Sequence, residues 1–213
     1  MNTKTGKPDT KQLILDSAEY LFANKGFRGT SMRAITGRAR VNIAAVNYHF
    51  GSKKTLLEAV IKRRIYPLNQ IRRAKLEQVR DKAREKGKNP AVRDVLYAFI
   101  QPTLQFRETE PGAKDFITFI GRSFADPDNT VRKVFVQFIK PMFQLLSESM
   151  SEALPKLSHE IIFWRLQFTM GALFHTLHIC GDINMGHMNI DELDTNALID
   201  LIIPYVTAGM KAK

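Results

Sequence analysis

Hydrophobic side chains recur every three or four residues along almost the whole chain, and no segment shows the sustained alternation that a half-buried β-strand needs. In the first such segment, residues 13–22 place their apolar and small side chains on one stripe. Asp9 or Thr10 can cap the start of this segment, and Lys25-Gly26 ends it. The pattern predicts an all-α protein.

Two short helices and one long helix follow. Their starts carry side chains that can bond the free amides of a first helical turn: Thr30 or Ser31, then Asn42, then Ser52. Arg40-Val41 forms the turn between the short helices, and the second of these runs to about Tyr48. The long helix is predicted over about 53–86. Pro67 inside it removes one backbone hydrogen bond, which predicts either a hinge or a tolerated bend.

Five further helices are predicted in the second half of the chain, near residues 91–107, 113–125, 129–153, 159–181 and 191–209. The chain therefore divides into an N-terminal three-helix domain over residues 1–53 and a larger helical domain over residues 54–213. No flexible linker separates them, so the long helix of about 53–86 must be the connection.

The basic residues are concentrated in the first part of the chain. Residues 1–90 hold 21 Lys and Arg against 7 Asp and Glu, whereas residues 91–213 hold 11 against 14. This division is typical of a nucleic-acid-binding part joined to a neutral part with another task, although a basic face can also serve solubility alone.

Several classes of protein do not fit the sequence. No apolar run approaches the length of a membrane span, and the polar residues 1–11 do not resemble a signal peptide. The single cysteine, Cys180, excludes an internal disulfide framework and fits a reducing compartment. We expect a cytoplasmic protein that contacts no membrane.

Neither a metal site nor an enzyme is expected, and no cofactor is predicted. His175, His178, Cys180 and Asp182 lie close together in the sequence, but their spacing matches no recognised ligand pattern. The chain also lacks a glycine-rich phosphate loop, a nucleophile elbow and paired carboxylates in an apolar setting.

The two short helices have the geometry of a helix-turn-helix, in which the second helix enters the major groove of DNA. Ile35 and Ala39 are expected to face the domain core, and Val41 to fill the turn. On the second helix, the spacing predicts that Ile43, Val46 and Phe50 point inward. The small and polar residues between them would then point toward the DNA.

Base edges and phosphates need different partners. Asn47 can bond an adenine edge and alanine methyls can meet thymine methyls, so the segment from Asn42 to Asn47 is predicted to read bases. The surrounding donors are predicted to bind phosphates. The complete set of predicted DNA-binding residues is Thr30, Ser31, Arg33, Arg40, Asn42, Ala44, Ala45, Asn47, Tyr48, His49 and Lys53.

This segment resembles the DNA-binding domain of the TetR family of bacterial regulators. The residues that carry the resemblance are Leu21-Phe22, Lys25-Gly26-Phe27, Thr30-Ser31, Ile35, Val41, Tyr48-His49-Phe50, Ser52-Lys53 and Leu56-Leu57. The block 41–54, with softer matches in the second half of the chain, is similar to the fatty-acid-responsive members of the PsrA type. Arg40 stands where the family usually has glycine, and it would be strained if the turn requires a left-handed backbone.

The resemblance implies a homodimer that binds a palindromic operator in double-stranded DNA. In the family, the last two helices usually form the dimer contact. The helices predicted near 159–181 and 191–209 are apolar on more than one face, which fits burial against a partner subunit.

The resemblance also implies a pocket for a small apolar or amphipathic effector within residues 91–181, and the subgroup implies a fatty acid or its acyl-CoA ester. Arg122, set among phenylalanines, is the candidate to meet a carboxylate. The predicted ligand-binding residues are Phe99, Phe106, Phe119, Arg122, Phe138, Met142, Trp164 and Phe168. The alternative is an ordinary core with a solvated or ion-paired Arg122.

The sequence thus favours a ligand-responsive, sequence-specific transcriptional regulator, and the family habit is repression. The alternative is a non-specific or architectural DNA-binding dimer without a small-molecule effector. A specific regulator keeps its preference for one operator at physiological salt, whereas a non-specific binder loses affinity for all sequences alike.

Overall fold

A computed structural model describes residues 9–179 and 194–212. In this part of the chain all regular secondary structure is helical: α1 (Thr10–Lys25), α2 (Met32–Ala39), α3 (Ile43–Phe50), α4 (Lys53–Glu85), α5 (Val92–Thr109), α6 (Ala113–Ala125), α7 (Thr130–Ala153), α8 (His159–Ile179) and α9 (Thr195–Lys211). The all-α prediction is confirmed. Cys180 and Asp182, considered above as metal ligands, lie outside the described residues.

Polar side chains begin the first four helices, as the sequence predicts. The side chains of Asp9, Ser31, Asn42 and Ser52 accept hydrogen bonds from backbone amides of the first turns of α1, α2, α3 and α4. Each cap satisfies a donor that the helix itself leaves free, so these residues fix where each helix begins.

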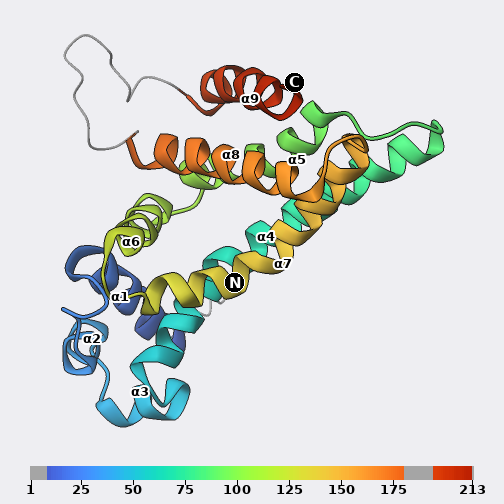
Figure 1. Ribbon diagram of the computed structural model, residues 1–213. Helices are drawn as coiled ribbons and strands as arrows, with labels where there is room; N and C mark the ends of the chain where they lie inside the picture. Colours follow the sequence, from blue (N-terminus) through green and yellow to red (C-terminus); the bar gives the residue numbers. More distant parts are fainter. Residues whose placement is uncertain (1–8, 180–193, 213) are drawn as a thin grey trace.

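The helices form an elongated molecule. Figure 1 shows α1, α2 and α3 gathered at one end and α8 and α9 at the other, with α4 and α7 running side by side between them. α4 continues through Pro67 as one helix of 33 residues. None of the described helices combines the length and hydrophobicity needed to cross a membrane.

The buried apolar side chains form two cores. The first core contains the buried residues of α1, α2, α3 and the start of α4 as far as Ile65, together with side chains from α6 and the start of α7. The second core contains Leu76 of α4, the buried face of α5, the later part of α7 from Met142, and α8 and α9. The division between the cores therefore crosses α4 between Ile65 and Leu76, and does not coincide with the sequence-based boundary at residue 53.

Candidate nucleic-acid interface and ligand region

The helix-turn-helix is held by the first core. Ile35 and Ala39 of α2 and Val46 and Phe50 of α3 are buried in it, and Val41 packs against it from the turn. These positions agree with the sequence-based prediction. Because α3 presents this face to α1 and α4, its opposite face is left at the surface.

Ile43 is the exception, and the prediction that it points inward is wrong. It is the first residue of α3 and is 46% exposed. Side chains of a helix lean toward its N-terminus, so the side chain of a first residue extends beyond the end of the helix. Ile43 therefore adds an apolar side chain to the outer surface of α3.

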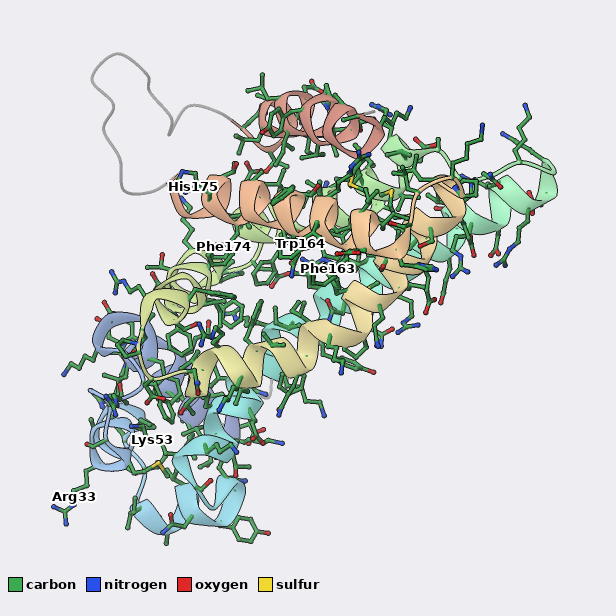
Figure 2. All side chains as sticks on the ribbon, in the orientation of Figure 1. Arg33, Lys53, Phe163, Trp164, Phe174 and His175 are labelled. Atoms are coloured by element: carbon green, nitrogen blue, oxygen red, sulfur yellow. The ribbon has the colours of Figure 1, made fainter. Side chains whose placement is uncertain are left out.

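The outer surface contains most of the predicted DNA-binding residues. Ser31, Arg33, Arg40, Asn42, Ala44, Asn47 and Tyr48 are exposed, while Ala45, His49 and Lys53 are partly buried. Arg33 extends away from α2 into solvent (Figure 2). Asn42 Oδ1 accepts a hydrogen bond from the Ala45 amide at 2.7 Å, and its NH₂ group is left to donate to another partner.

Thr30 does not belong to this surface. Its side chain is 1% exposed, and its hydroxyl lies within hydrogen-bonding distance of the carbonyl oxygens of Leu21 (3.1 Å) and Gly26 (2.8 Å). The prediction that it binds a phosphate is therefore replaced by a structural role, in which Thr30 ties the start of the helix-turn-helix to the end of α1.

Lys53 also makes a contact within the protein, so its ammonium group is only partly accessible to DNA. Its Nζ lies 4.3 Å from the centre of the Phe27 ring. Partial burial lowers the pKa of Lys53, and the nearby Asp128 carboxylate offsets only part of this effect. Arg33 and Arg40 are the more accessible cations of the predicted set.

Arg40, which stands where the family usually has glycine, adopts the left-handed backbone conformation that was expected to strain it. Its φ is 54° and its ψ is 42°, and its amide donates to Thr36 O to close α2. This left-handed conformation costs a non-glycine residue about 1 kcal/mol. Among the described residues other than glycine, Arg40 alone has a positive φ.

Replacing Arg40 with Gly is expected to raise the free energy of unfolding by about 1 kcal/mol, because the strain is removed. The same change should weaken binding to all DNA and reduce the salt dependence by about one phosphate contact. Urea denaturation and fluorescence anisotropy over a salt series measure the two effects. Arg33→Gly, at a regular helical position, is the control and should lower stability instead; a stability loss in both variants would contradict the strain at Arg40.

The helix-turn-helix is joined to the rest of the molecule through α1. Glu19 is buried and forms ion pairs with both Arg63 and Arg64 of α4. Phe22 stacks on Phe119 of α6, with ring centres 5.8 Å apart. Because α1 also packs against α2 and α3, it links the helix-turn-helix to both α4 and α6.

The predicted ligand-binding residues do not lie in one place. Phe99 and Met142 belong to the second core, and Phe106 and Phe138 pack against the first. Phe119 stacks on the helix-turn-helix domain, as described above. Trp164 and Phe168 are exposed on α8. None of the eight residues lines either of the two hollows described in the structure.

Arg122 is not placed as predicted. Its side chain is exposed and donates from Nη1 to Ala23 O at 3.1 Å. It thus helps to hold α6 against the end of α1. The cation inside the larger domain is Arg72 of α4, which sequence reasoning missed. One feature of the sequence could have identified Arg72: it lies four positions from both Leu68 and Leu76, on the apolar stripe of a long helix.

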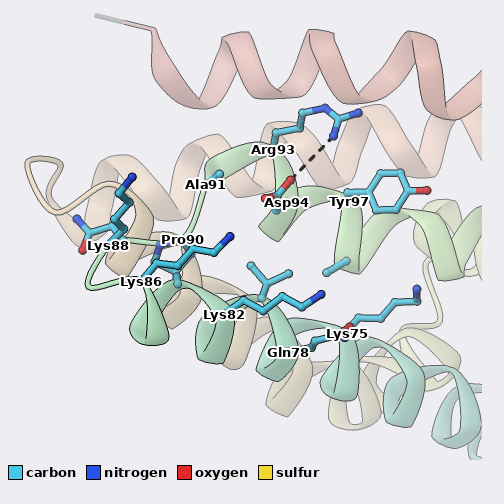
Figure 3. A pocket seen from close by; sticks show the side chains of 14 residues that line it. Lys75, Gln78, Lys82, Lys86, Lys88, Pro90, Ala91, Arg93, Asp94 and Tyr97 are labelled. Carbon is cyan, nitrogen blue, oxygen red and sulfur yellow. Dashed lines mark ion pairs between the residues drawn. The ribbon is translucent and has the colours of Figure 1, made fainter.

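A basic hollow of about 490 Å³ lies between the last turns of α4 and the start of α5 (Figure 3). Asp94 is the single carboxylate of its lining, and it pairs with Arg93 at 3.9 Å. The cationic lining residues are Lys75, Lys82, Lys86, Lys88 and Arg93. Most of these cationic side chains are at the surface and remain solvated.

Two protein-family models match separate parts of this chain. A family model of the tetR family of bacterial regulatory proteins matches residues 14–60, and a model of the tetracyclin repressor-like C-terminal domain matches residues 97–209. The chain belongs to the TetR family. This family consists of transcriptional regulators and not of enzymes.

Curated relatives match over the helix-turn-helix region. The probable regulator YttP of Bacillus subtilis is 46% identical over 55 residues, which are 26% of this chain and 27% of the relative. The negative regulator IcaR of the biofilm operon of Staphylococcus aureus is 38% identical over 61 residues, or 29% of this chain and 33% of the relative. The matched part thus spans about a third or less of the length of these relatives.

Solved structures match over nearly the whole chain. The fatty acid degradation regulator FadR of Bacillus halodurans superposes with a TM-score of 0.68 at 15% identity, covering 98% of this chain and 100% of its own. FadR of Bacillus subtilis, solved with stearoyl-CoA, gives 0.67 at 15% identity, covering 93% and 98%. At these identities the likeness shows the TetR-family fold alone.

Proposed function

We propose that this protein is a homodimeric repressor that binds a palindromic operator and is released by a long-chain fatty acid or acyl-CoA. The observation that carries the proposal is the outer surface of α3, where Asn47 and small side chains are exposed beside the accessible cations Arg33 and Arg40. Exposed amide and methyl groups can read bases, and flanking cations bind phosphates.

The exposed faces of α8 and α9 support the homodimer. Trp164 and Phe168 project from α8, and Leu201 and Tyr205 from α9, although each helix already buries its opposite face in the second core. Gly171 lies on the same face of α8, and nothing in this chain would meet a side chain there. A glycine among exposed aromatics allows a second helix to approach closely, so a second copy of this chain fits this face best.

The lipid effector is supported by the fold and by the subgroup resemblance. FadR of Bacillus subtilis has the same fold and was solved with stearoyl-CoA. The α6–α7–α8 region of this chain is rich in aromatic side chains, among them Phe124, which contacts both Phe135 and Phe174. Figure 2 shows that Phe163, Trp164 and Phe174 come from α8 in this region.

The decisive experiment is selection of DNA from a random library at physiological salt, followed by release with palmitate and palmitoyl-CoA. A single palindromic site that is bound in preference to competitor DNA and released by one of the lipids is the expected result. Equal affinity for all sequences, falling steeply with salt and unaffected by lipid, would favour the architectural alternative.

Asn47→Ala is expected to reduce the preference for the operator over competitor DNA by about tenfold or more, because it removes a base contact. Arg33→Ala is the matched control: it should weaken binding to operator and competitor alike and reduce the slope of affinity against salt by about one contact. Fluorescence anisotropy with both DNAs measures these changes. Identical behaviour of the two variants would mean that the base-reading and phosphate-binding roles are assigned incorrectly.

A further inference from the structure

Arg72 is a buried cation without an anionic partner. Its side chain is 4% exposed, and it donates from Nη1 to Asn69 Oδ1 at 2.9 Å and from Nη2 to Thr103 Oγ1 at 2.6 Å. Its guanidinium carbon lies 4.4 Å from the centre of the Phe99 ring, and its Nε has no hydrogen-bond partner. Within residues 9–179 and 194–212, no Asp or Glu pairs with it.

Such an arrangement is costly to the unliganded fold. Removal of a charge from water costs several kcal/mol unless an opposite charge compensates it. Burial lowers the pKa of Arg72 to about 9, so the side chain is still charged at neutral pH, and its two neutral hydrogen-bond acceptors offset only part of the cost. Arg63, Arg64 and Arg80, the other partly buried arginines of α4, each pair with a carboxylate.

The position of Arg72 is suited to regulation. It lies on α4 in the interval between Ile65 of the first core and Leu76 of the second core. Asn69, which accepts one of its hydrogen bonds, donates to Phe138 O on α7 at 2.9 Å. Phe138 packs against the first core and Phe99 belongs to the second, so Arg72 lies at the junction of the two cores.

We infer that Arg72 binds the carboxylate of an apolar acid, so that the effector is a free fatty acid and not its CoA thioester. This inference rests on the proposed lipid effector and specifies its head group. A carboxylate would supply the missing charge and an acceptor for Nε, while an acyl chain would lie among the apolar side chains of the two cores.

An acyl-CoA would use different groups. Its thioester is neutral and leaves Arg72 uncompensated, whereas its phosphates would suit the basic hollow of Figure 3. Lys82 and Lys86 in that hollow are exposed, and solvated ammonium groups require no partner. The buried guanidinium is the group that requires one, and this favours the free acid.

The test compares binding of palmitate, hexadecanol and palmitoyl-CoA to the full-length protein by calorimetry. The wild type is expected to bind palmitate about tenfold to a hundredfold more tightly than hexadecanol, as for one charged hydrogen-bonded pair. In Arg72→Met this difference should vanish, while the ligand-free variant should melt at or above the wild-type temperature because the uncompensated charge is gone. Arg73→Met, an exposed neighbour on α4, should retain the wild-type preference.

Equal binding of acid and alcohol by the wild type would overturn the inference. So would an Arg72→Met variant that keeps the acid preference, or one that melts several degrees lower, since the arginine would then be purely structural. Release of DNA by palmitoyl-CoA alone, lost in a Lys82→Glu/Lys86→Glu variant and kept in Arg72→Met, would leave the proposed function standing and remove Arg72 from it. Palmitate binding through Arg72 without release of DNA would contradict the proposed function and leave the inference intact.

Discussion

Replacement of Phe168 with Glu is expected to dissociate the dimer and to weaken operator binding by at least about a hundredfold. Phe168 is 69% exposed in the single chain, so the change costs the monomer little. In a dimer formed by α8 and α9, the same change would bury a carboxylate among aromatic side chains. Two linked recognition helices bind two half-sites with an avidity of about 10²–10⁴ over one, and this gain disappears with the dimer.

Analytical ultracentrifugation and gel-shift titration of the operator measure the two effects. Val136→Glu is the matched control, since Val136 is also an exposed apolar residue but lies on α7, outside the proposed interface. It should sediment and bind DNA like the wild type. A Phe168→Glu variant that sediments as a dimer would show that the contact between subunits lies elsewhere.

Replacement of Glu19 with Gln is expected to lower the free energy of unfolding by about 3 kcal/mol, because it leaves two partly buried guanidinium groups without a shared carboxylate. Glu19 accepts from Arg63 Nη2 at 2.6 Å and from Arg64 Nε at 2.9 Å. Gly112 lies against this cluster: a Cβ at that position would meet Arg64 Nη2 at 2.8 Å. The cluster therefore holds α1, α4 and the turn before α6 together.

For a chain of this size, the loss corresponds to a decrease of about 6–12 °C in melting temperature, which differential scanning calorimetry resolves. Asp16→Asn is the control. Asp16 also pairs with Arg63, at 2.6 Å, but its carboxylate is largely exposed, so its loss should cost less than about 1 kcal/mol. If both variants had the same melting temperature, burial of Glu19 would not be the source of the stability.

The helices and their beginnings could be predicted from the sequence, because helical periodicity and capping are local properties. The side chains of Asn42 and Ser52 can cap a helix, and α3 and α4 begin immediately after them. Ile43 shows where the periodic pattern fails. The pattern assigns every residue to a face of the helix, but it cannot show that the first turn of α3 extends beyond the core. Thr30 shows a second limit, because a hydroxyl that serves its own backbone looks the same in the sequence as one that binds a phosphate.

The interior of the larger domain could not be predicted in the same way. Arg122 has phenylalanines close to it along the chain and Arg72 has none, so the sequence favoured Arg122. In the fold, Arg122 turns to the carbonyl of Ala23, whereas Arg72 is enclosed by α5. This distinction depends on which helices pack together over long sequence separations, and local patterns do not contain it.

The shared membership of α4 in both cores has a mechanical consequence. The helical segment from Lys53 to Pro67 is about 21 Å long and forms a lever. A rotation of about 10° at its far end moves the helix-turn-helix by about 4 Å, which is close to the rise of one base pair. In a dimer that spans half-sites about 34 Å apart, two opposite displacements of this size shift the recognition helices by about two base pairs. A small angular change between the cores is thus sufficient to put both helices out of register with the operator.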